Sequence, residues 1–504
     1  MTLRLPLCLL VLCASLPASA PAPGAPWGAQ SLWDAWPQAR VAPADPWSLK
    51  HAGLRQTLDG LQARHPGLLT LVEEGLSAEG RKIPLLRVGT GPTGILLWSQ
   101  MHGDEPTATA ALLDALNWLG THRQDAAVKQ FLSRVTLWII PMLNPDGAER
   151  TQRWNAQGID INRDALRLST PEGRYLKAVR DRLRPALGYN LHNQNPLLRA
   201  GRAGSQAAIS VLSVPGDEAD SGALGTRKTR QLALEVQRLV QALAPGRVAR
   251  YDTDYTARAF GDSMTRWGTP TLLIETGGWG GPGEAGRLVR LNFVALLGSL
   301  AAVADGSFEA MDPADYGRIP LNQRDALGTL VVRNTRLASG RGFPPFVADL
   351  SFVIPGAFAG EAIRRLEPGL VELGDLADFK GVDEFDAAGM LAVPWPTQPE
   401  TGWASLREAL QARGLVETDE ATLLAAARAL GEAAVARSGF TGAVLLYRTL
   451  ATGRLKLEGA VLRGQLAGLP TPRQGVSKPS LGLNGGNQPD VNPVKCGTPS
   501  AAPG

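Results

Sequence analysis

The chain has 504 residues, of which 44% are hydrophobic and 19% are charged. This length is too great for one ordinary domain and predicts two or three folded units with ample core. The net charge of +4 comes from Lys and Arg residues spread along the sequence, without the basic stripe of a nucleic-acid-binding protein or the polybasic patch of a membrane-surface protein. We therefore expect no nucleic-acid partner.

The first residues have the plan of a secretory signal. Arg4 precedes an apolar run at residues 5–16, and small residues follow that run. The run is too short to span a bilayer comfortably, so residues 1–22 are predicted to be a signal peptide, with no transmembrane segment. We expect the protein to be secreted or periplasmic.

The few cysteines give further information. Cys13 partly resembles a lipoprotein acylation site, but the large Leu12 stands where a small residue is expected, so a lipid anchor is not expected. After removal of the signal only Cys496 remains. This excludes a disulfide framework and a cysteine-based metal site.

Strands and helices are predicted to alternate in a domain at residues 46–305. A Pro-, Ala- and Trp-rich lead-in without periodicity precedes it at 23–45, and helical spacing then predicts a helix at 49–63. Short apolar runs predict strands at residues 68–72, 83–88, 94–100, 135–143, 188–191 and 271–274. Helices are predicted between them at residues 107–119, 172–183 and 229–244. This order predicts an α/β fold with a mostly parallel mixed sheet flanked by helices.

A change of composition near Asp312 marks a second unit, which contains no histidine. We predict a smaller α+β accessory domain at residues 312–465. Its expected elements are strands at 329–332, 346–354, 442–447 and 454–462 and helices at 405–412 and 421–436. Residues 466–504 are rich in Pro, Gly, Ser and Asn and are predicted to be a disordered tail.

Two of the five histidines are placed as metal ligands would be. His102 and Glu105 are three residues apart after one predicted strand, and His192 follows another. Binding groups gather at the carboxyl ends of strands in such sheets. Two histidines and one carboxylate are a zinc-binding set that leaves a fourth position for water. A His-x-x-Glu pair alone is also explained by a surface turn, but the motifs around it favour one Zn²⁺ held by these three residues.

The turn at residues 144–147, Asn-Pro-Asp-Gly, leads to Arg153 and then to a run that contains three polar residues of interest. Asn162 and Arg163 offer a carboxylate an amide and a guanidinium fork, and could hold a free C-terminus. Asp160 could accept the second ring N–H of a ligating histidine and so fix its tautomer. The alternative is that these residues only build an Asx-type turn.

Glu275 ends the apolar run of a predicted strand, beside a glycine-rich turn. Partial burial would raise its pKa toward neutrality, which suits a general base that takes a proton from water and gives it to a leaving amine. Without the other motifs, Glu275 would be interpreted as a charge at the end of a strand.

The order of these motifs resembles the zinc carboxypeptidases, the M14 family of carboxypeptidase A-like metallopeptidases. The resemblance covers about residues 44–305 and includes the segment Gly75-Leu-Ser-Ala-Glu-Gly-Arg81. It implies the carboxypeptidase fold and a role for each motif. The implied roles are zinc binding by His102, Glu105 and His192, polarisation of the scissile carbonyl by Arg153, carboxylate binding by Asn162 and Arg163, and general-base catalysis by Glu275.

Two points of the resemblance leave alternatives. Arg150 is the less favoured alternative to Arg153. The family also has a substrate-binding tyrosine before the catalytic glutamate, for which Tyr251 and Tyr255 both qualify; Tyr255 is the one we choose.

The predicted function is that of a zinc metallocarboxypeptidase, which hydrolyses the C-terminal amide bond of a peptide or peptide-like substrate. One alternative is an N-acyl amino acid amidohydrolase of a related zinc family. Another is an inactive homologue that binds peptide or cell-wall material. The Asn-Pro-Asp-Gly turn, the export signal and the Glu-Thr-Gly-Gly sequence at 275–278 favour the peptidase, and the complete set of ligands, clamp and base argues against the inactive protein.

Overall fold

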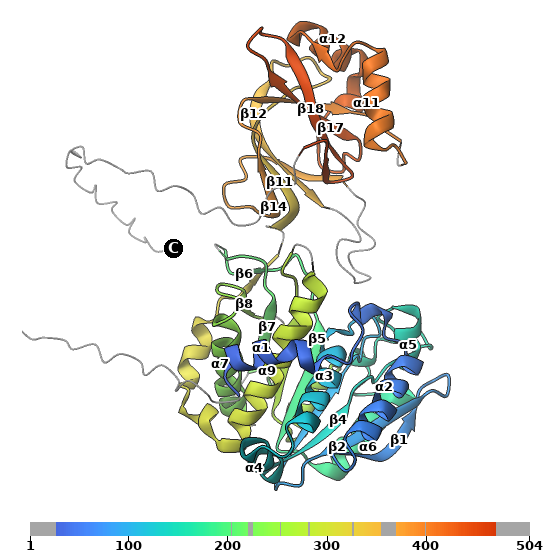
Figure 1. The fold of residues 1–504 in the computed structure, drawn as a ribbon, viewed down its shortest axis with the longest axis vertical. Coiled ribbons are helices and arrows are strands. Elements are labelled where there is room, and N and C mark those ends of the chain that lie inside the picture. The colour runs from blue at the N-terminus through green and yellow to red at the C-terminus, as the bar shows by residue number, and fades with distance from the viewer. Residues whose placement is uncertain are drawn as a thin grey trace, which may run out of the picture.

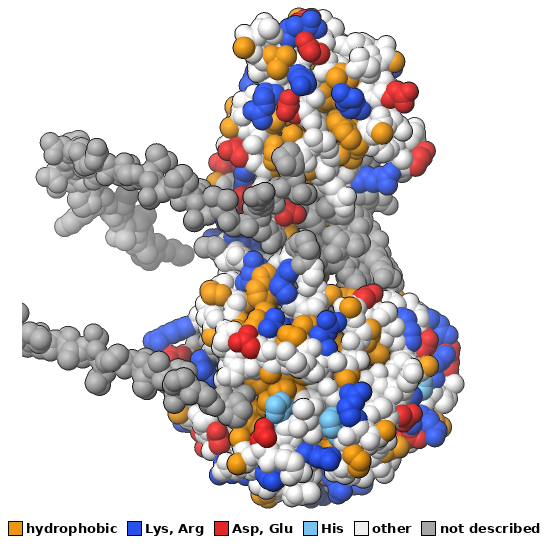
Figure 2. Space-filling view, viewed as in Figure 1, with side chains coloured by type: hydrophobic (Ala, Val, Ile, Leu, Met, Phe, Trp, Pro, Cys, Tyr) orange, Lys and Arg blue, Asp and Glu red, His pale blue; other side chains and the backbone are white. Residues whose placement is uncertain are grey.

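The computed structural model describes residues 27–469, apart from residues 203, 220–224, 252–253, 281–282, 325–326, 354–368 and 399. The predicted signal peptide with Cys13, and most of the predicted tail with Cys496, lie outside the described residues. The described chain forms two bodies stacked along the long axis, each built on its own sheet (Figure 1). On the face drawn in Figure 2, Lys and Arg side chains are interspersed with Asp and Glu over both bodies.

The first domain is built on a mixed sheet of eight strands in the order β1-β2-β4-β3-β5-β9-β7-β8. The pairs β4–β3, β3–β5, β5–β9 and β7–β8 are parallel, and the other three are antiparallel. The strands are β1 Leu69–Leu76, β2 Lys82–Val88, β3 Thr93–Ser99, β4 Val135–Ile140, β5 Leu187–Asn193, β7 Ile209–Ser213, β8 Val248–Arg250 and β9 Thr271–Thr276. The predicted mostly parallel mixed sheet is confirmed.

Both faces of this sheet are covered because its central strands are apolar on both sides. In β3, Ile95 and Leu97 contribute to the core on one face, and Leu96 and Trp98 to the core on the other. Such strands appear in the sequence as continuous apolar runs. The first face is covered by α1 Ala29–Ala39, α2 His51–Arg64, α3 Thr107–Thr121, α4 Ala126–Arg134, α7 Thr226–Gln241 and α9 Glu284–Asp305. The second face is covered by α6 Pro171–Leu183 and α8 Phe260–Arg266.

The folded part begins earlier than expected, because α1 lies within the predicted lead-in. Leu32, Trp36 and Ala39 are buried at helical spacing and pack with α9 and α3. The side chain of Asp114 in α3 accepts hydrogen bonds from Trp36 Nε1 at 2.9 Å and from the backbone N–H groups of Val41 and Ala42 at 2.8 and 3.0 Å. The interpretation of this segment as a lead-in without periodicity is therefore wrong. The short apolar stripe was obscured by Pro37, which lies inside the helix.

The sequence analysis also missed α9. This helix is long and apolar enough to cross a membrane by length and composition, but 83% of that stretch is buried inside the structure. It packs against α3, α7 and α1. A helix that is apolar all round is expected at the centre of a large domain.

The second domain contains a nine-stranded sheet that is mostly antiparallel, in the order β13-β12-β11-β15-β17-β18-β16, with β14 beside β11 and β19 beside β18. Its strands are β11 Leu327–Leu337, β12 Phe346–Val353, β13 Gly369–Gly374, β14 Lys380–Asp386, β15 Met390–Trp395, β16 Glu417–Thr418, β17 Ala443–Thr449, β18 Leu455–Leu462 and β19 Gln465–Ala467. Two helices, α11 Trp403–Ala412 and α12 Glu420–Leu430, pack on one face. The predicted C-terminal α+β unit is confirmed.

Two boundaries in this domain differ from prediction. The helix expected at 421–436 ends at Leu430, because Gly431 has a φ of 55° and a single 3₁₀ turn follows at Gly431–Ala434. The tail expected from residue 466 begins within β19, which pairs with β18.

A short two-stranded sheet joins the domains. Its strands are β6 Arg199–Ala200, which follows β5, and β10 Asn322–Gln323, which precedes β11. The carboxyl end of β4 leads into α5 Pro145–Arg150 on the side of the first domain that faces the second domain (Figure 1).

Candidate metal centre and substrate cavity

The predicted site residues gather where the central parallel strands end. His102 comes three residues after β3, and His192 is the second-to-last residue of β5. Glu275 lies opposite His192 in the neighbouring strand β9. All three line one cavity with a volume of about 400 Å³, together with Glu105, Arg153, Asn162 and Arg163. The sequence motifs, which are up to 173 residues apart, therefore form one site.

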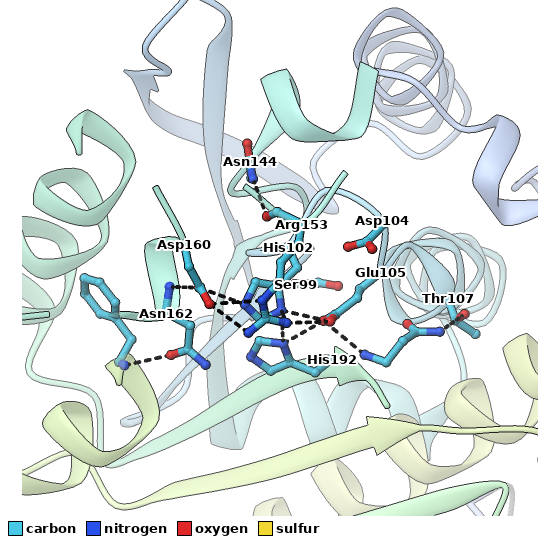
Figure 3. A network of polar contacts seen from close by, with 12 residues as sticks. Ser99, His102, Asp104, Glu105, Thr107, Asn144, Arg153, Asp160, Asn162 and His192 are labelled. Atoms are coloured by element: carbon cyan, nitrogen blue, oxygen red, sulfur yellow. Dashed lines mark hydrogen bonds and ion pairs between the residues drawn. The ribbon is translucent and has the colours of Figure 1, made fainter. Parts of the chain in front are cut away.

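The two histidines and Glu105 converge on one point (Figure 3). His102 Nδ1 lies 2.8 Å from Glu105 Oε1, and His192 Nδ1 lies 2.7 Å from Glu105 Oε2. The two Nδ1 atoms are 3.1 Å apart. The three side chains are buried, and their ligand atoms all lie within 4.8 Å of one another. Two imidazole nitrogens and one carboxylate at this spacing are a donor set that suits zinc.

The charges of this group are strongly coupled. Burial disfavours ionisation of Glu105, but the two imidazoles lower the pKa of its carboxyl well below the usual range. Burial likewise opposes protonation of His102, yet the carboxylates of Glu105 and Asp160 raise its pKa. A carboxylate that stays ionised in a buried place is what a cation site requires.

The backbone that leads into the loop of His102 and Glu105 has an uncommon conformation at Gln100 and is tightly packed at Gly103. Gln100, just after β3, has a positive φ of 51°, and its side-chain Nε2 donates to the carbonyl of Gly103 at 2.9 Å. Gly103 leaves no room for a side chain, since a Cβ would lie 2.0 Å from the backbone carbon of Gly147. Strained, tightly packed backbone of this kind is common at functional sites.

Asp160 connects the metal centre to Arg153. Its Oδ1 lies 3.1 Å from His102 Nε2, and its Oδ2 accepts a hydrogen bond from Arg153 Nε at 3.0 Å. Arg153 Nη1 in turn lies 3.1 Å from His102 Nδ1. Asp160 also caps a 3₁₀ turn at Ile161–Arg163, accepting from the backbone N–H of Asn162 at 2.8 Å. Asp160 thus occupies the place that the sequence analysis gives it, next to the ring nitrogen that faces away from the ligand set.

The turn at Asn144 holds the backbone of Arg153. Asn144 Oδ1 caps α5 by accepting from the Gly147 N–H at 2.8 Å, and its Nδ2 donates to the Arg153 carbonyl at 3.3 Å. The side chain of Arg150 instead bonds Glu79 and the carbonyl of Asp146, and Arg150 does not line the cavity. Arg153 is therefore the arginine that faces the metal centre.

The proposed carboxylate clamp lines the same cavity. Asn162 Oδ1 accepts from the Phe260 N–H at 2.8 Å, which leaves the Nδ2 donors toward the cavity (Figure 3). The exposed Arg163 donates through Nη1 to the Asn162 carbonyl at 2.7 Å. A neutral donor and a cation therefore stand side by side at the cavity wall.

Glu275 is buried at the end of β9. Burial, reinforced by the charge of Glu105, raises the pKa of its carboxyl to about 8. Four buried polar atoms of cavity residues have no hydrogen-bond partner within the described part of the chain. These atoms are Glu275 Oε2, His192 Nε2, Asn190 Oδ1 and Asn193 Oδ1. Such atoms are rare in folded proteins and are typical of a site that receives an ion, water or ligand.

The tyrosine beside the site is Tyr251, and the choice of Tyr255 needs correction. Tyr251 follows β8 and lines the cavity, whereas Tyr255 does not. The negative charge on Glu275 and then burial raise the pKa of the Tyr251 hydroxyl, so the two groups are close in space. No local motif in the sequence distinguishes the two tyrosines. Tyr251 is distinguished in the structure by its place next to β7, where its backbone N–H donates to the Val211 carbonyl at 2.9 Å.

Other cavity residues were not found from the sequence. Asp262, at the start of α8, lines the wall together with a set of neutral residues, Asn190, Leu212, Val214, Ala259, Gly261 and Leu273. Residues 193–196 form another part of the wall. Neither group carries a motif, and they meet only through the fold.

The fold and the ligand set define an α/β domain with a two-histidine, one-carboxylate zinc site. Residues 54–174 match the family described as Zinc carboxypeptidase, Peptidase_M14. The matched residues include His102 and Glu105, and together with His192 these residues form a zinc site typical of M14 carboxypeptidases.

Curated relatives are similar to a part of the chain. Carboxypeptidase 2 of Trichophyton rubrum is 28% identical over 162 residues, which cover 29% of this chain and 29% of that protein. Carboxypeptidase E of Caenorhabditis elegans is 31% identical over 134 residues, 22% of this chain and 28% of that protein. The chain thus spans less than a third of the length of these relatives.

Two solved structures are also similar. One is a metallo-carboxypeptidase from Pseudomonas aeruginosa, with a TM-score of 0.42 and 19% identity, covering 50% of this chain and 68% of that one. The other is carboxypeptidase A from Helicoverpa armigera, with a TM-score of 0.43 and 18% identity, covering 55% and 80%.

Proposed function

We propose that the protein is a zinc metallocarboxypeptidase that removes the C-terminal residue of a peptide. The observation that carries this proposal is that the zinc ligands, Glu275, Arg153 and the Asn162–Arg163 pair line one cavity of about 400 Å³. His102, Glu105 and His192 would hold a zinc ion, which would supply Lewis-acid chemistry for the activation of water near neutral pH.

The remaining steps are assigned to side chains of the chain itself. Nδ2 of Asn162 and the guanidinium of Arg163 bind the terminal carboxylate, which fixes the scissile bond in the cavity. Arg153 stabilises the negative charge that develops on the carbonyl oxygen. Glu275 takes a proton from the attacking water and gives it to the departing nitrogen, a role that suits a carboxyl whose pKa is raised to about 8 by burial.

Release of amino acids from a panel of peptides, with and without a chelator, tests this function. We expect zinc-dependent release of the last residue, and no release from the same peptides with an amidated C-terminus. Equal turnover of amidated peptides would contradict the carboxylate clamp. Hydrolysis of N-acyl amino acids without hydrolysis of peptides would instead identify an amidohydrolase.

We also propose that the protein is exported, as the plan of residues 1–22 predicts. N-terminal sequencing of the mature protein from culture medium or periplasm tests this, and an intact Met1 on cytoplasmic protein would contradict it.

A further inference from the structure

One wall of the cavity is formed by the segment that follows the ligand His192, here called the wall loop (residues 193–198). Asn193, Gln194, Asn195 and Pro196 of this loop line the cavity. Asn193 also borders the ligand set, since its N–H lies 3.2 Å from Glu105 Oε2. The conformation of the wall loop therefore affects the shape of the site directly.

The wall loop is bonded to the segment that connects the two domains. Asn322, in β10, donates through Nδ2 to Gln194 Oε1 at 2.9 Å, and its Oδ1 accepts from the hydroxyl of Ser210 at 2.9 Å. Asn322 and Gln194 are both buried. Because a buried amide left without a partner is costly, this chain of bonds specifies one orientation of Gln194.

The far end of the wall loop packs into the second domain. Leu197 is buried in a small apolar cluster with Leu327, Val353, Val371 and Val382, which belong to β11, β12, β13 and β14. Just beyond the loop, Arg199 Nη1 donates to the Asp378 carbonyl of the second domain at 2.6 Å. The loop is thus held by residues of the second domain as well as by the connecting segment.

We propose that the second domain and the segment that connects it to the first are structural components of the active site: the Leu327 cluster and Asn322 position the wall loop and thereby the substrate. The positioning of the substrate rests on the proposed peptidase function, whereas the positioning of the wall loop does not. Asn322 and Leu327 are positioning residues, which act through Gln194 and Leu197.

Matched variants of β11 and β10 test the proposal in the full chain. Leu327→Ala removes a neighbour of Leu197, whereas Leu330→Ala, in the same strand, removes volume from a core of the second domain that does not include Leu197. Asn322→Ala removes the donor to Gln194. Hydrogen exchange of the amides at 193–198 is measured at a temperature where thermal unfolding shows all variants folded. We expect faster exchange in N322A and L327A and no change in L330A.

Turnover of peptides gives the second readout. We expect N322A to lower kcat/KM roughly tenfold, the effect of one lost buried hydrogen bond, with zinc affinity unchanged. In a Q194A background N322A should have no further effect on kcat/KM, because Asn322 acts through Gln194. A purely stabilising role would lower the thermal midpoint and leave these quantities unchanged.

Unchanged exchange of the wall loop in both N322A and L327A, or an equal change in L330A, would overturn the proposal. If the wild-type protein cleaves no peptide, the proposed function fails, and the exchange experiment still decides whether the second domain positions the loop.

Discussion

Asp160 lies 3.1 Å from His102 Nε2, on the side of the imidazole opposite to the ligand atom Nδ1. A carboxylate in this place keeps the proton on Nε2 and the lone pair on Nδ1, which is the tautomer that binds a cation. The same carboxylate bonds Arg153, so the ligand and the cationic side chain share one anchor.

Replacing Asp160 with Asn is expected to weaken zinc binding roughly 10- to 100-fold, the usual effect of losing such a partner of a metal ligand. The amide can still accept from the ring N–H, but it does not stabilise positive charge on the imidazole. Competition with a chromophoric chelator measures the affinity. Asp181→Asn, at a more exposed aspartate on α6, is the control. Equal affinities of D160N and the wild type would remove Asp160 from this role.

Replacing Glu275 with Gln is expected to retain zinc and to lower kcat by several orders of magnitude, because Gln cannot accept the proton of the attacking water. The side chain keeps its size within the buried end of β9, so the fold should be unchanged. Single-turnover kinetics and metal analysis on the same sample check both parts. Substantial activity in E275Q would show that another group moves the proton.

The ligand set could be predicted from sequence because each part belongs to a short motif at the end of a strand. His102 and Glu105 lie in one loop, and His192 and Glu275 end apolar runs that the fold places side by side. The strands themselves were predictable for the same reason, since both of their faces are buried. The order of strands in the sheet was beyond prediction from such local patterns.

The features that the sequence missed or left undecided depend on contacts between distant segments. Asp262 and Tyr251 reach the cavity only through the packing of α8 and the end of β8, and no spacing in the sequence distinguishes Tyr251 from Tyr255. The bond from Asn322 to Gln194 joins residues 128 positions apart. Polar residues of this kind acquire a function from a tertiary partner, which local sequence does not name.

Asp262 is expected to favour substrates that end in Lys or Arg. It lies on the cavity wall beside the neutral residues Ala259 and Gly261, and burial raises the pKa of its carboxyl to about 6 despite the nearby charge of Arg163. A cationic side chain in the cavity would offset the cost of ionising this carboxyl. Asp262→Asn should therefore lower kcat/KM for peptides ending in Lys and leave it nearly unchanged for those ending in Leu.

The same preference should depend on pH. Below about pH 6 the Asp262 carboxyl becomes protonated and neutral, so the ratio of kcat/KM for Lys over Leu termini should fall between pH 7 and pH 5. Effects of pH on zinc binding and on Glu275 cancel in this ratio, because both substrates use them. A ratio that stays constant, or that is equal in D262N and the wild type, would show that Asp262 does not select the side chain.

Asp114 is expected to make the attachment of α1 dependent on pH. Burial outweighs its three N–H donors and raises the pKa of its carboxyl from 3.8 to about 6. The folded state therefore binds more protons than the unfolded state between these values, and stability falls as the pH rises from about 4 to about 6. The loss is on the order of 3 kcal/mol, since the pKa moves by about two units and one pKa unit is about 1.4 kcal/mol.

Asp114→Asn isolates this contribution, because an amide does not titrate. Its Oδ1 can still accept from the N–H groups of Val41 and Ala42, but its NH₂ group faces the Trp36 N–H, so one hydrogen bond is lost at every pH. The difference in thermal midpoint between the wild type and D114N should therefore be largest near pH 4 and shrink toward pH 7. A difference that instead grows with pH would contradict this expectation. It would show that the three N–H donors stabilise the Asp114 carboxylate more than burial destabilises it, so that the pKa of Asp114 is low in the folded state.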